Sequence, residues 1–325
     1  GGAVWKTLGN PAVNVNSRYA AISHGRTRIM GLNNIELITD RGLSVNLREM
    51  AEVKKKYPNH ALIASIMVGS KAQWQEIIKR VEDAGADALE LNFSCPHGMC
   101  ERGMGSAIGQ EPKIAEEITV WARESASVPV IVKLTPNVAD IRDQGRAAVH
   151  GEADGVALIN TIKSIIGVDL DDFIPFPKLR NGSTNGGYCG PAIKPIALHM
   201  VASLGRDSSF NLPISGIGGI NNWRDAAEFI ALGCSSVQVC TAVMHHGFAI
   251  VEEMIDGLTA YLAEKGMGSV AELQGRALVN YKNWGDLDMN YKVAASIRED
   301  DCIGCNKCYV ACRDGAYQAI ELSEK

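Results

Sequence analysis

The sequence predicts an α/β fold, a TIM (β/α)8 barrel whose first βα unit is missing, followed by a short cysteine-rich module. Short apolar, β-branched segments alternate with amphipathic helical segments, and polar residues follow nearly every apolar segment. Seven strands plus one missing strand make eight, and barrels place polar residues at the carboxyl ends of their strands, so we favour a barrel over a doubly wound sheet. The expected strands are Ala3–Lys6, Ala61–Met67, Ala88–Asn92, Val130–Leu134, Val156–Asn160, Leu212–Ser215 and Ser236–Val239.

Helices are expected between these strands, as in a parallel sheet covered by helices. We expect Gly85, Gly151 and Gly233 each to end the helix that precedes it. Gly1 and Gly2 stand before a strand in the same way, so we expect a helix and a strand to precede the printed sequence. The expected helices are Asn46–Tyr57, Gln73–Ala84, Pro112–Ser125, Ala139–His150, Lys194–Leu204, Trp223–Leu232 and Phe248–Glu264.

The composition excludes several classes of protein. A chain of 325 residues that is 46% hydrophobic and 21% charged can bury a large core, which excludes disorder, a collagen-like chain and a disulfide-stapled miniprotein. The net charge of -5 argues against a nucleic-acid partner. No run of about 18 apolar residues occurs, so we expect no membrane span. The nine cysteines are an odd number, and their clustering favours metal ligation and a reducing, cytoplasmic setting.

Four cysteines near the C-terminus form one unbroken motif, Cys-x2-Cys-x2-Cys-x3-Cys, at Cys302, Cys305, Cys308 and Cys312. This spacing is typical of a [4Fe–4S] cluster, whereas a zinc ribbon needs two separated pairs. Arg313 stands where such motifs usually carry proline, and no second motif follows. We therefore expect a barrel over residues 1–285 and a truncated ferredoxin-type iron–sulfur module over residues 286–325.

Two loops near the end of the barrel suggest a phosphate site. Gly218 and Gly219 follow the seventh strand of a full barrel, and Cys240 and Thr241 follow the eighth. In barrels these loops bind phosphate through backbone N–H groups, which implies a phosphorylated cofactor. The alternative for the glycines is an ordinary tight βα turn. No G-x-G-x-x-G motif with a downstream acid follows a strand, so the sequence predicts no Rossmann site for NAD.

Lys6 and Lys133 each end an expected strand at the mouth of the barrel. A lysine that points inward there must meet an anion or lose its charge. A flavin fits, because a cation near flavin N1 stabilises the anionic reduced ring and raises its potential. The alternative is a solvated lysine at a strand terminus.

Asparagines gather at the same rim: Asn34, Asn92, Asn137 and Asn160, the last followed by Thr161. An amide offers a donor and an acceptor, and both are needed to bind the alternating C=O and N–H edge of a pyrimidine imide. The alternative is that these residues cap helices or form turns, as Asn137 does if it belongs to a turn after Thr135-Pro136.

Cys95 lies in a glycine-rich segment that follows the strand Ala88–Asn92 and is expected to close as a lid. A neutral thiol at the mouth can give a proton, a role that suits an ordinary cysteine pKa of about 8.5. The alternative is an inert core cysteine. We interpret His97 and Cys100 as loop residues, since their spacing matches no zinc motif.

Together these residues resemble the dihydropyrimidine dehydrogenases, and in particular their pyrimidine-reducing FMN and iron–sulfur subunit or domain, in the dihydroorotate-dehydrogenase-like superfamily. The resemblance covers nearly the whole chain, although Cys100 stands where some members have glycine. It implies reduction of uracil or thymine to the 5,6-dihydropyrimidine. The motifs are Leu-Asn-Phe-Ser-Cys-Pro-His-Gly-Met over 91–99, Lys-Leu-Thr-Pro-Asn over 133–137, Ile-Asn-Thr over 159–161, Ala-Ile-Lys-Pro-Ile-Ala-Leu over 192–198 and the cysteine run.

The resemblance also implies roles for individual residues. Cys95 matches the general acid that protonates C5 after hydride transfer from FMN N5 to C6. The substrate contacts are matched by Asn34, Glu36, Asn92, Ser94, Asn160 and Thr161. The FMN contacts are matched by Lys6, Thr7, Asn34, Lys133, Gly190, Gly218, Gly219, Cys240 and Thr241. Electrons are expected to come through the clusters from a separate FAD-containing subunit that oxidises NAD(P)H, in an oligomeric assembly.

Two other functions stay open at this point. The barrel motifs overlap with those of a dihydroorotate-type dehydrogenase that works in the oxidative direction. The chain could also be a non-catalytic electron-transfer subunit, in which the asparagines and Cys95 would have no purpose.

Overall fold

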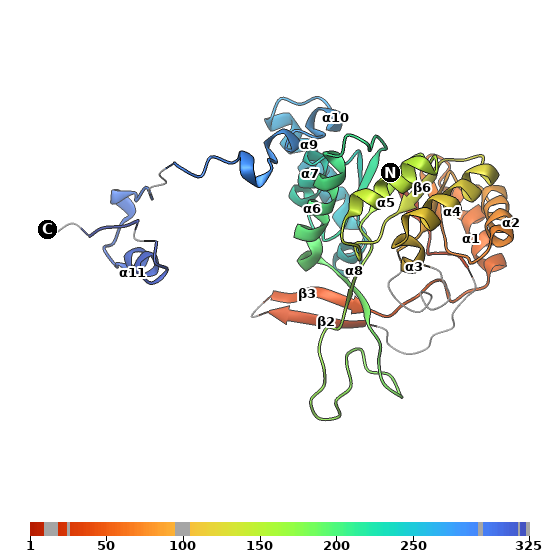
Figure 1. The fold of residues 1–325 in the computed structure, drawn as a ribbon, viewed down its shortest axis with the longest axis horizontal. Helices are drawn as coiled ribbons and strands as arrows, with labels where there is room; N and C mark the ends of the chain where they lie inside the picture. The colour runs from red at the N-terminus through yellow and green to blue at the C-terminus, as the bar shows by residue number, and fades with distance from the viewer. Residues whose placement is uncertain (10–18, 25–26, 95–104, 292–294, 318, 323–325) are drawn as a thin grey trace. The chain divides into compact units, whose positions relative to one another are not determined.

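A sheet of seven parallel strands lies at the centre of the larger of two units in the computed structural model (Figure 1). The structure describes residues 1–9, 19–24, 27–94, 105–291, 295–317 and 319–322. The larger unit spans Gly1–Tyr281 and the smaller one Lys282–Lys325. In spatial order the strands are β1 (Gly2–Val4), β4 (Ala61–Ile66), β5 (Ala88–Asn92), β6 (Val130–Lys133), β7 (Gly155–Leu158), β10 (Ile214–Ile217) and β11 (Ser236–Gln238).

This strand order confirms the predicted barrel architecture. Each strand pairs in parallel with the next strand of the sheet, and helices connect most neighbours, which is the pattern of a (β/α)8 barrel. β1 and β11 form the two edges of the sheet. The helices are α1 (Leu43–Lys56), α2 (Lys71–Asp83), α3 (Ser106–Gly109), α4 (Pro112–Ser125), α5 (Ile141–His150), α6 (Lys194–Gly205), α7 (Trp223–Ala231), α8 (Thr241–His246), α9 (Ala249–Glu264) and α10 (Val270–Leu273).

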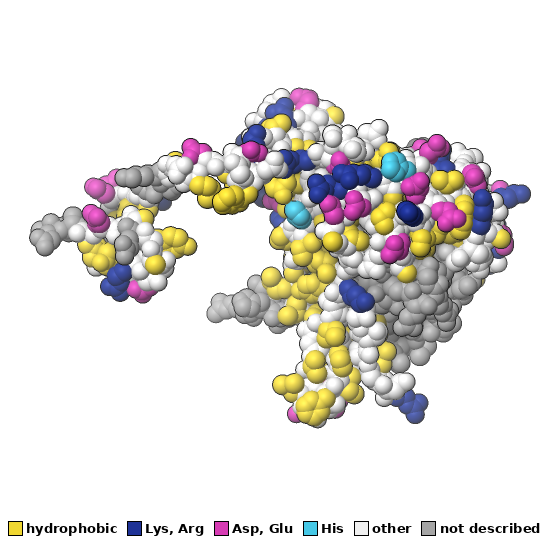
Figure 2. Space-filling model, viewed as in Figure 1, with side chains coloured by type: hydrophobic (Ala, Val, Ile, Leu, Met, Phe, Trp, Pro, Cys, Tyr) yellow, Lys and Arg dark blue, Asp and Glu magenta, His cyan; other side chains and the backbone are white. Residues whose placement is uncertain are grey.

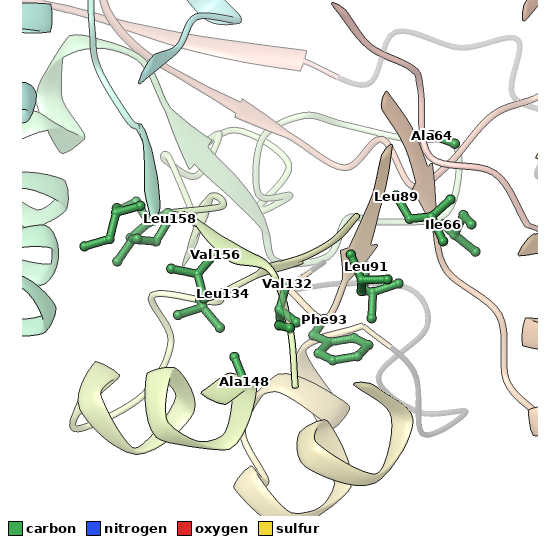
Figure 3. Close-up of a cluster of buried hydrophobic side chains, with 14 of the residues drawn as sticks. Ala64, Ile66, Leu89, Leu91, Phe93, Val132, Leu134, Ala148, Val156 and Leu158 are labelled. Atoms are coloured by element: carbon green, nitrogen blue, oxygen red, sulfur yellow. The ribbon is translucent and has the colours of Figure 1, made fainter. Parts of the chain in front are cut away.

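The hydrophobic core lies between the outer face of this sheet and the helices (Figure 3). On β5, Leu89 and Leu91 point toward the helices and are completely buried, as are Val132 of β6 and Leu158 of β7. Side chains alternate between the two faces of a strand, so Glu90 and Asn92 of β5 point to the opposite face. One face of each strand therefore builds the core, and the other face is left for the inside of the barrel.

A second sheet, which the sequence did not predict, lies beside the first (Figure 1). It is antiparallel, in the order β2 (Tyr19–His24), β3 (Thr27–Asn34), β9 (Gly186–Cys189) and β8 (Ile162–Ser164). Its strands carry few of the β-branched runs that indicate a strand, and β3 pairs with a segment more than 150 residues later. Local sequence patterns do not show such distant pairing. The segment between β8 and β9 exposes Ile165, Val168, Leu170 and Phe173 (Figure 2).

Glycine is required at the predicted helix ends for two different structural reasons. Gly85 and Gly233 have φ of 91° and 111°, the left-handed conformation that such a glycine permits. Gly151 has φ of -77° instead, and the following Glu152 takes the positive φ of 60°. A Cβ on Gly151 would lie 2.6 Å from Cβ of Thr119, so Gly151 lets α5 approach α4 closely.

The smaller unit contains one α-helix within its described residues, α11 (Lys307–Asp314). Across the described ranges of the whole chain, no helix combines the length and the apolar character needed to cross a membrane.

Replacing Gly151 by alanine is expected to lower the free energy of unfolding by about 1–3 kcal/mol, because the new Cβ overpacks the contact with Thr119. Gly42→Ala is the matched control, since Gly42 has φ of -58° and a Cβ added there would meet no atom within 4 Å. We expect this control to cost less than about 1 kcal/mol. Urea denaturation measures both, and equal losses would contradict the close-packing role of Gly151.

Candidate active site at the carboxyl ends of the strands

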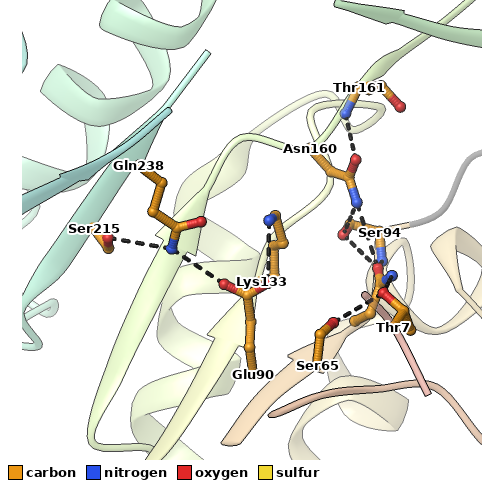
Figure 4. A network of polar contacts seen from close by, with 10 residues as sticks. Thr7, Ser65, Glu90, Ser94, Lys133, Asn160, Thr161, Ser215 and Gln238 are labelled. Atoms are coloured by element: carbon orange, nitrogen blue, oxygen red, sulfur yellow. Dashed lines mark hydrogen bonds and ion pairs between the residues drawn. The ribbon is translucent and has the colours of Figure 1, made fainter. Parts of the chain in front are cut away.

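The polar residues that follow the strands meet at one end of the sheet (Figure 4). Asn92 at the end of β5 lies directly opposite Lys133 at the end of β6 in the parallel register. Thr7 follows β1 and Ser65 belongs to β4. The carboxyl ends of parallel strands lie on the same side of a sheet, so the fold brings these side chains together although they are far apart in the sequence.

An ion pair between Lys133 and Glu90 is buried within this group. Nζ of Lys133 is 3.1 Å from Oε1 of Glu90, whose side chain is only 1% exposed. Nε2 of Gln238 on β11 donates to the other oxygen of Glu90 over 3.1 Å and to Oγ of Ser215 over 3.3 Å. β5 and β11 are four places apart in the strand order, and only a curled sheet brings them into contact. Lys133 is therefore not a solvated lysine at a strand end.

A second group of polar side chains surrounds Asn92. Its Nδ2 donates to Oγ1 of Thr7 over 3.1 Å, and Thr7 in turn is 2.9 Å from Oγ of Ser65. Oδ1 of Asn92 accepts from the backbone N–H and the hydroxyl of Ser94 over 3.2 and 2.9 Å. Nδ2 of Asn160 donates to the hydroxyl of Ser94 over 2.7 Å. The result is a connected set of uncharged donors and acceptors (Figure 4).

Asn137 has a different role from the other three asparagines. Its Nδ2 donates to Oγ1 of Thr135 over 3.0 Å and to the backbone carbonyl of Thr161 over 3.2 Å. Its Oδ1 accepts from the backbone N–H of Lys163 over 2.8 Å. These contacts favour the interpretation of Asn137 as a turn residue that fixes the backbone of the neighbouring loop.

The small antiparallel sheet brings Asn34 to the segment that contains Thr161. Nδ2 of Asn34 donates to the backbone carbonyl of Gly187 on β9 over 3.0 Å. A Cβ on Gly187 would collide with Oγ1 of Thr161, so only glycine allows Thr161 to come this close. Cys189 lies two residues after Gly187 on β9, and the sequence analysis did not name it as a site residue. Burial raises the pKa of its thiol.

Lys6 pairs with Glu36 at the edge of the site. Nζ of Lys6 is 3.1 Å from Oε2 of Glu36, and the side chain of Lys6 is 45% exposed. The hydroxyl of Tyr19 on β2 also donates to Oε2 of Glu36. The sequence did not indicate Tyr19 as a site residue, because β2, the strand that carries it, was not predicted.

Three glycines and Thr241 form a cradle that is free of bulky side chains. Gly190, Gly218 and Gly219 have φ of 99°, 140° and 76°, a region that disfavours residues with a Cβ. A Cβ on Gly219 would lie 2.9 Å from the carbonyl oxygen of Gly190, and one on Gly190 would lie 3.7 Å from Cγ2 of Thr241. Cys240 directly precedes α8, which begins at Thr241. The close packing admits only glycine here, and glycine-rich backbone beside the start of a helix is the kind of group that binds phosphate, so the residues fit the phosphate of a flavin nucleotide.

The four cysteines of the motif lie in the smaller unit. Cys308 and Cys312 are four residues apart on α11 and share one helix face, while Cys302 and Cys305 precede it. Within the described residues, no three potential ligands converge on one metal position. The donor chemistry nonetheless fits a [4Fe–4S] cluster, because four thiols at this spacing are available in one short segment and three of them are exposed.

Cys95, His97 and Cys100 lie outside the described residues, so the structure leaves the predictions for them as they were. Ser94, the residue before Cys95, is completely buried and belongs to the Asn92 group.

The dihydroorotate dehydrogenase family matches residues 6–262, which is most of the larger unit. The chain belongs to this family. A 4Fe-4S dicluster domain matches residues 295–325, which confirms the predicted iron–sulfur module. FMN and [4Fe–4S] clusters are the cofactors of such proteins, and this member of the family is an oxidoreductase.

Among the curated relatives, the NAD-dependent dihydropyrimidine dehydrogenase subunit PreA of Escherichia coli K12 is 42% identical over 327 residues, which cover 100% of this chain and 79% of the relative. The chloroplastic dihydropyrimidine dehydrogenase (NADP(+)) of Arabidopsis thaliana is 40% identical over 92% of this chain and 73% of its own length. The catalytic subunit of dihydroorotate dehydrogenase B (NAD(+)) of Pyrococcus abyssi is 40% identical over 86% of this chain and 87% of its own length. These relatives confirm the resemblance to the dihydropyrimidine dehydrogenases that the sequence motifs indicated.

Gly219→Ala is expected to weaken FMN binding at least about tenfold, because its Cβ would collide with the carbonyl oxygen of Gly190 and close the cradle. Gly247→Ala is the matched control: Gly247 has a similar φ of 80°, but a Cβ added there would meet no atom within 4 Å. Both variants place a side chain at a positive φ, so a weakening of FMN binding that occurs only in Gly219→Ala points to the cradle and not to a general effect of such a side chain. Flavin fluorescence titration measures the affinity, and equal FMN affinity in the two variants would refute the cradle.

Proposed function

We propose that this chain reduces uracil and thymine to their 5,6-dihydropyrimidines, with electrons delivered through [4Fe–4S] clusters. The observation that supports this most is the connected set of uncharged amides and hydroxyls formed by Asn92, Ser94 and Asn160 at the mouth of the barrel. A pyrimidine imide needs alternating donors and acceptors without net charge, and this set supplies both.

The residues that match substrate contacts have complementary roles in this proposal. The amides of Asn34, Asn92 and Asn160 offer donors and acceptors to the ring carbonyls and N–H groups. The carboxylate of Glu36 accepts from a ring N–H group, and Lys6 and Tyr19 hold that carboxylate in place. Their positions on separate strands and loops fix the orientation of the ring.

Bound FMN would supply the hydride, from N5 to C6 of the pyrimidine. Lys133 would stabilise the negative charge of the reduced flavin ring, and the glycine cradle would hold the phosphate. Cys95 then gives its thiol proton to C5 as the general acid. It follows Ser94 directly, so the Asn92 group anchors the chain at the point where it enters the Cys95 segment.

The electron donor in this proposal is a separate subunit that contains FAD and oxidises NAD(P)H. The support is that the Escherichia coli relative is named as a subunit and as NAD-dependent, and that the Pyrococcus abyssi relative is named as a catalytic subunit. An oligomer of both kinds of subunit follows from this assignment.

A dihydroorotate-type dehydrogenase is the second candidate, because relatives with that name match most of this chain. Orotate carries a carboxylate that calls for a cation. In the described part of the site, Lys6 is paired with Glu36 and Lys133 with Glu90, so both lysines already face a carboxylate. This pairing favours a neutral pyrimidine as the substrate.

Anaerobic turnover with a reduced artificial donor separates the two candidates. We expect uracil and thymine to be consumed, with loss of their ultraviolet absorbance, while orotate is reduced at less than about a tenth of their rate. Preferential turnover of orotate, or of dihydroorotate with an oxidant, would establish the second candidate. Flavin extraction in the same preparation tests the third possibility, a subunit that only transfers electrons and holds no FMN.

Cys95→Ala is expected to lower turnover of uracil by roughly 10²–10⁴-fold, because a positioned acid contributes about that much, while the flavin and cluster spectra stay unchanged. Cys95→Ser should be little better, since a hydroxyl is a far weaker acid. The rate of the parent should fall as the pH rises through the pKa of the thiol, and this limb should be absent in the alanine variant.

Cys234→Ala is the control for loss of a thiol. Cys234 is buried outside the site, and burial raises its pKa to about 12, so its removal should leave turnover near the parent rate. If Cys95→Ala also turns over near the parent rate, Cys95 is a structural residue.

A further inference from the structure

Glu90 is a buried carboxylate to which the proposed reaction gives no role. It lies on β5 with 1% of its side chain exposed, on the face of the strand opposite the hydrophobic core. Removing a carboxylate from water is costly unless a cation and hydrogen bonds compensate for it. Lys133 and Gln238 provide this compensation, each over 3.1 Å.

The contacts of Glu90 hold it rigidly inside the barrel. Gln238 reaches it from β11, and Gln238 is itself fixed by the hydroxyl of Ser215, which also accepts from Ser236 over 2.9 Å. Glu90 thus joins β5 and β6 to the far side of the curled sheet (Figure 4). Lys133 is tied to this fixed point, and its side chain is only 14% exposed.

The ammonium group of Lys133 carries three N–H donors, and Glu90 accepts one of them. Among the described residues, Glu90 is the acceptor that the structure gives Lys133, so its other N–H groups can serve the flavin that the proposed function places at the mouth of the barrel.

We propose that Glu90 is a positioning residue for Lys133. Its carboxylate draws the ammonium group toward itself and offsets part of the positive charge, so that the flavin potential lies below the value that Lys133 alone would give. This inference rests on the assignment of FMN to the barrel in the proposed function.

Glu90→Gln tests this role with little change of shape. The amide oxygen can still accept from Gln238, but the negative charge is lost, so Lys133 faces the anionic reduced flavin unopposed. We expect the ratio of the dissociation constants of oxidised and reduced FMN to rise at least about tenfold, which for a two-electron couple equals about 30 mV of potential. Redox titration of the flavin measures this ratio without reference to turnover.

A double-mutant cycle shows whether Glu90 acts through Lys133. In the Lys133→Met background, Glu90→Gln is expected to change the ratio less than about threefold, because the group that it positions is gone. A shift of equal size in both backgrounds would overturn the positioning role, since the carboxylate would then act on the flavin directly. An unchanged ratio in the single variant Glu90→Gln would overturn the inference as a whole.

Glu124→Gln controls for the change of net charge. Glu124 lies exposed on α4, where it pairs with Lys71 over 2.9 Å, so its loss should leave the ratio unchanged. If Glu90→Gln does not retain FMN, Glu90→Asp replaces it, because aspartate keeps the charge but withdraws it from Lys133 by one methylene. The ratio should then shift in the same direction by a smaller factor, and no shift would overturn the inference.

Turnover of uracil by the parent protein separates this inference from the proposed function. If the parent binds FMN and reduces uracil, an unchanged ratio in Glu90→Gln removes only the role of Glu90. If the parent binds FMN but reduces no pyrimidine, the proposed function fails, and the ratio still decides whether Glu90 positions Lys133.

Discussion

The alternation of side chains along the parallel strands is the constraint on which this structure depends. On β5, Leu89 and Leu91 bury themselves against the helices, while Glu90 and Asn92 between and after them face the inside of the barrel. A shift of the strand by one residue would exchange the two sets and place a carboxylate in the hydrophobic core. The packing that stabilises the fold therefore also fixes the position of the polar site.

The parallel sheet could be predicted from the sequence because its signals are local. Each of its strands is a short apolar run next to an amphipathic helix, and the structure agrees with the expected strands to within about two residues at most ends. The antiparallel sheet could not be predicted, since β8 and β9 are short, and β9 contains Gly186 and Gly187. Their stability comes from pairing with distant segments, which no local pattern shows.

The same distinction applies to the candidate site. The residues at strand ends, such as Asn92 and Lys133, stand out in the sequence because their position relative to an apolar run is visible. The sequence does not show which of them pair with a carboxylate. It did not indicate that Glu90 is the partner of Lys133, or that Tyr19 is a partner of Glu36. Gly151 shows a related limit. It ends its helix as predicted, but glycine is required there for packing against Thr119 and not for a left-handed turn.

The hydrogen bond between Asn34 and Gly187 joins parts of the chain that are 153 residues apart. Closing so long a segment costs chain entropy that only later contacts repay, and distant pairings of this kind slow folding. The parallel strands can assemble from neighbouring βα units before this pairing exists. We therefore expect the barrel wall to form early and the antiparallel sheet late, so that a nascent or refolding chain completes the candidate site only in the last step of folding.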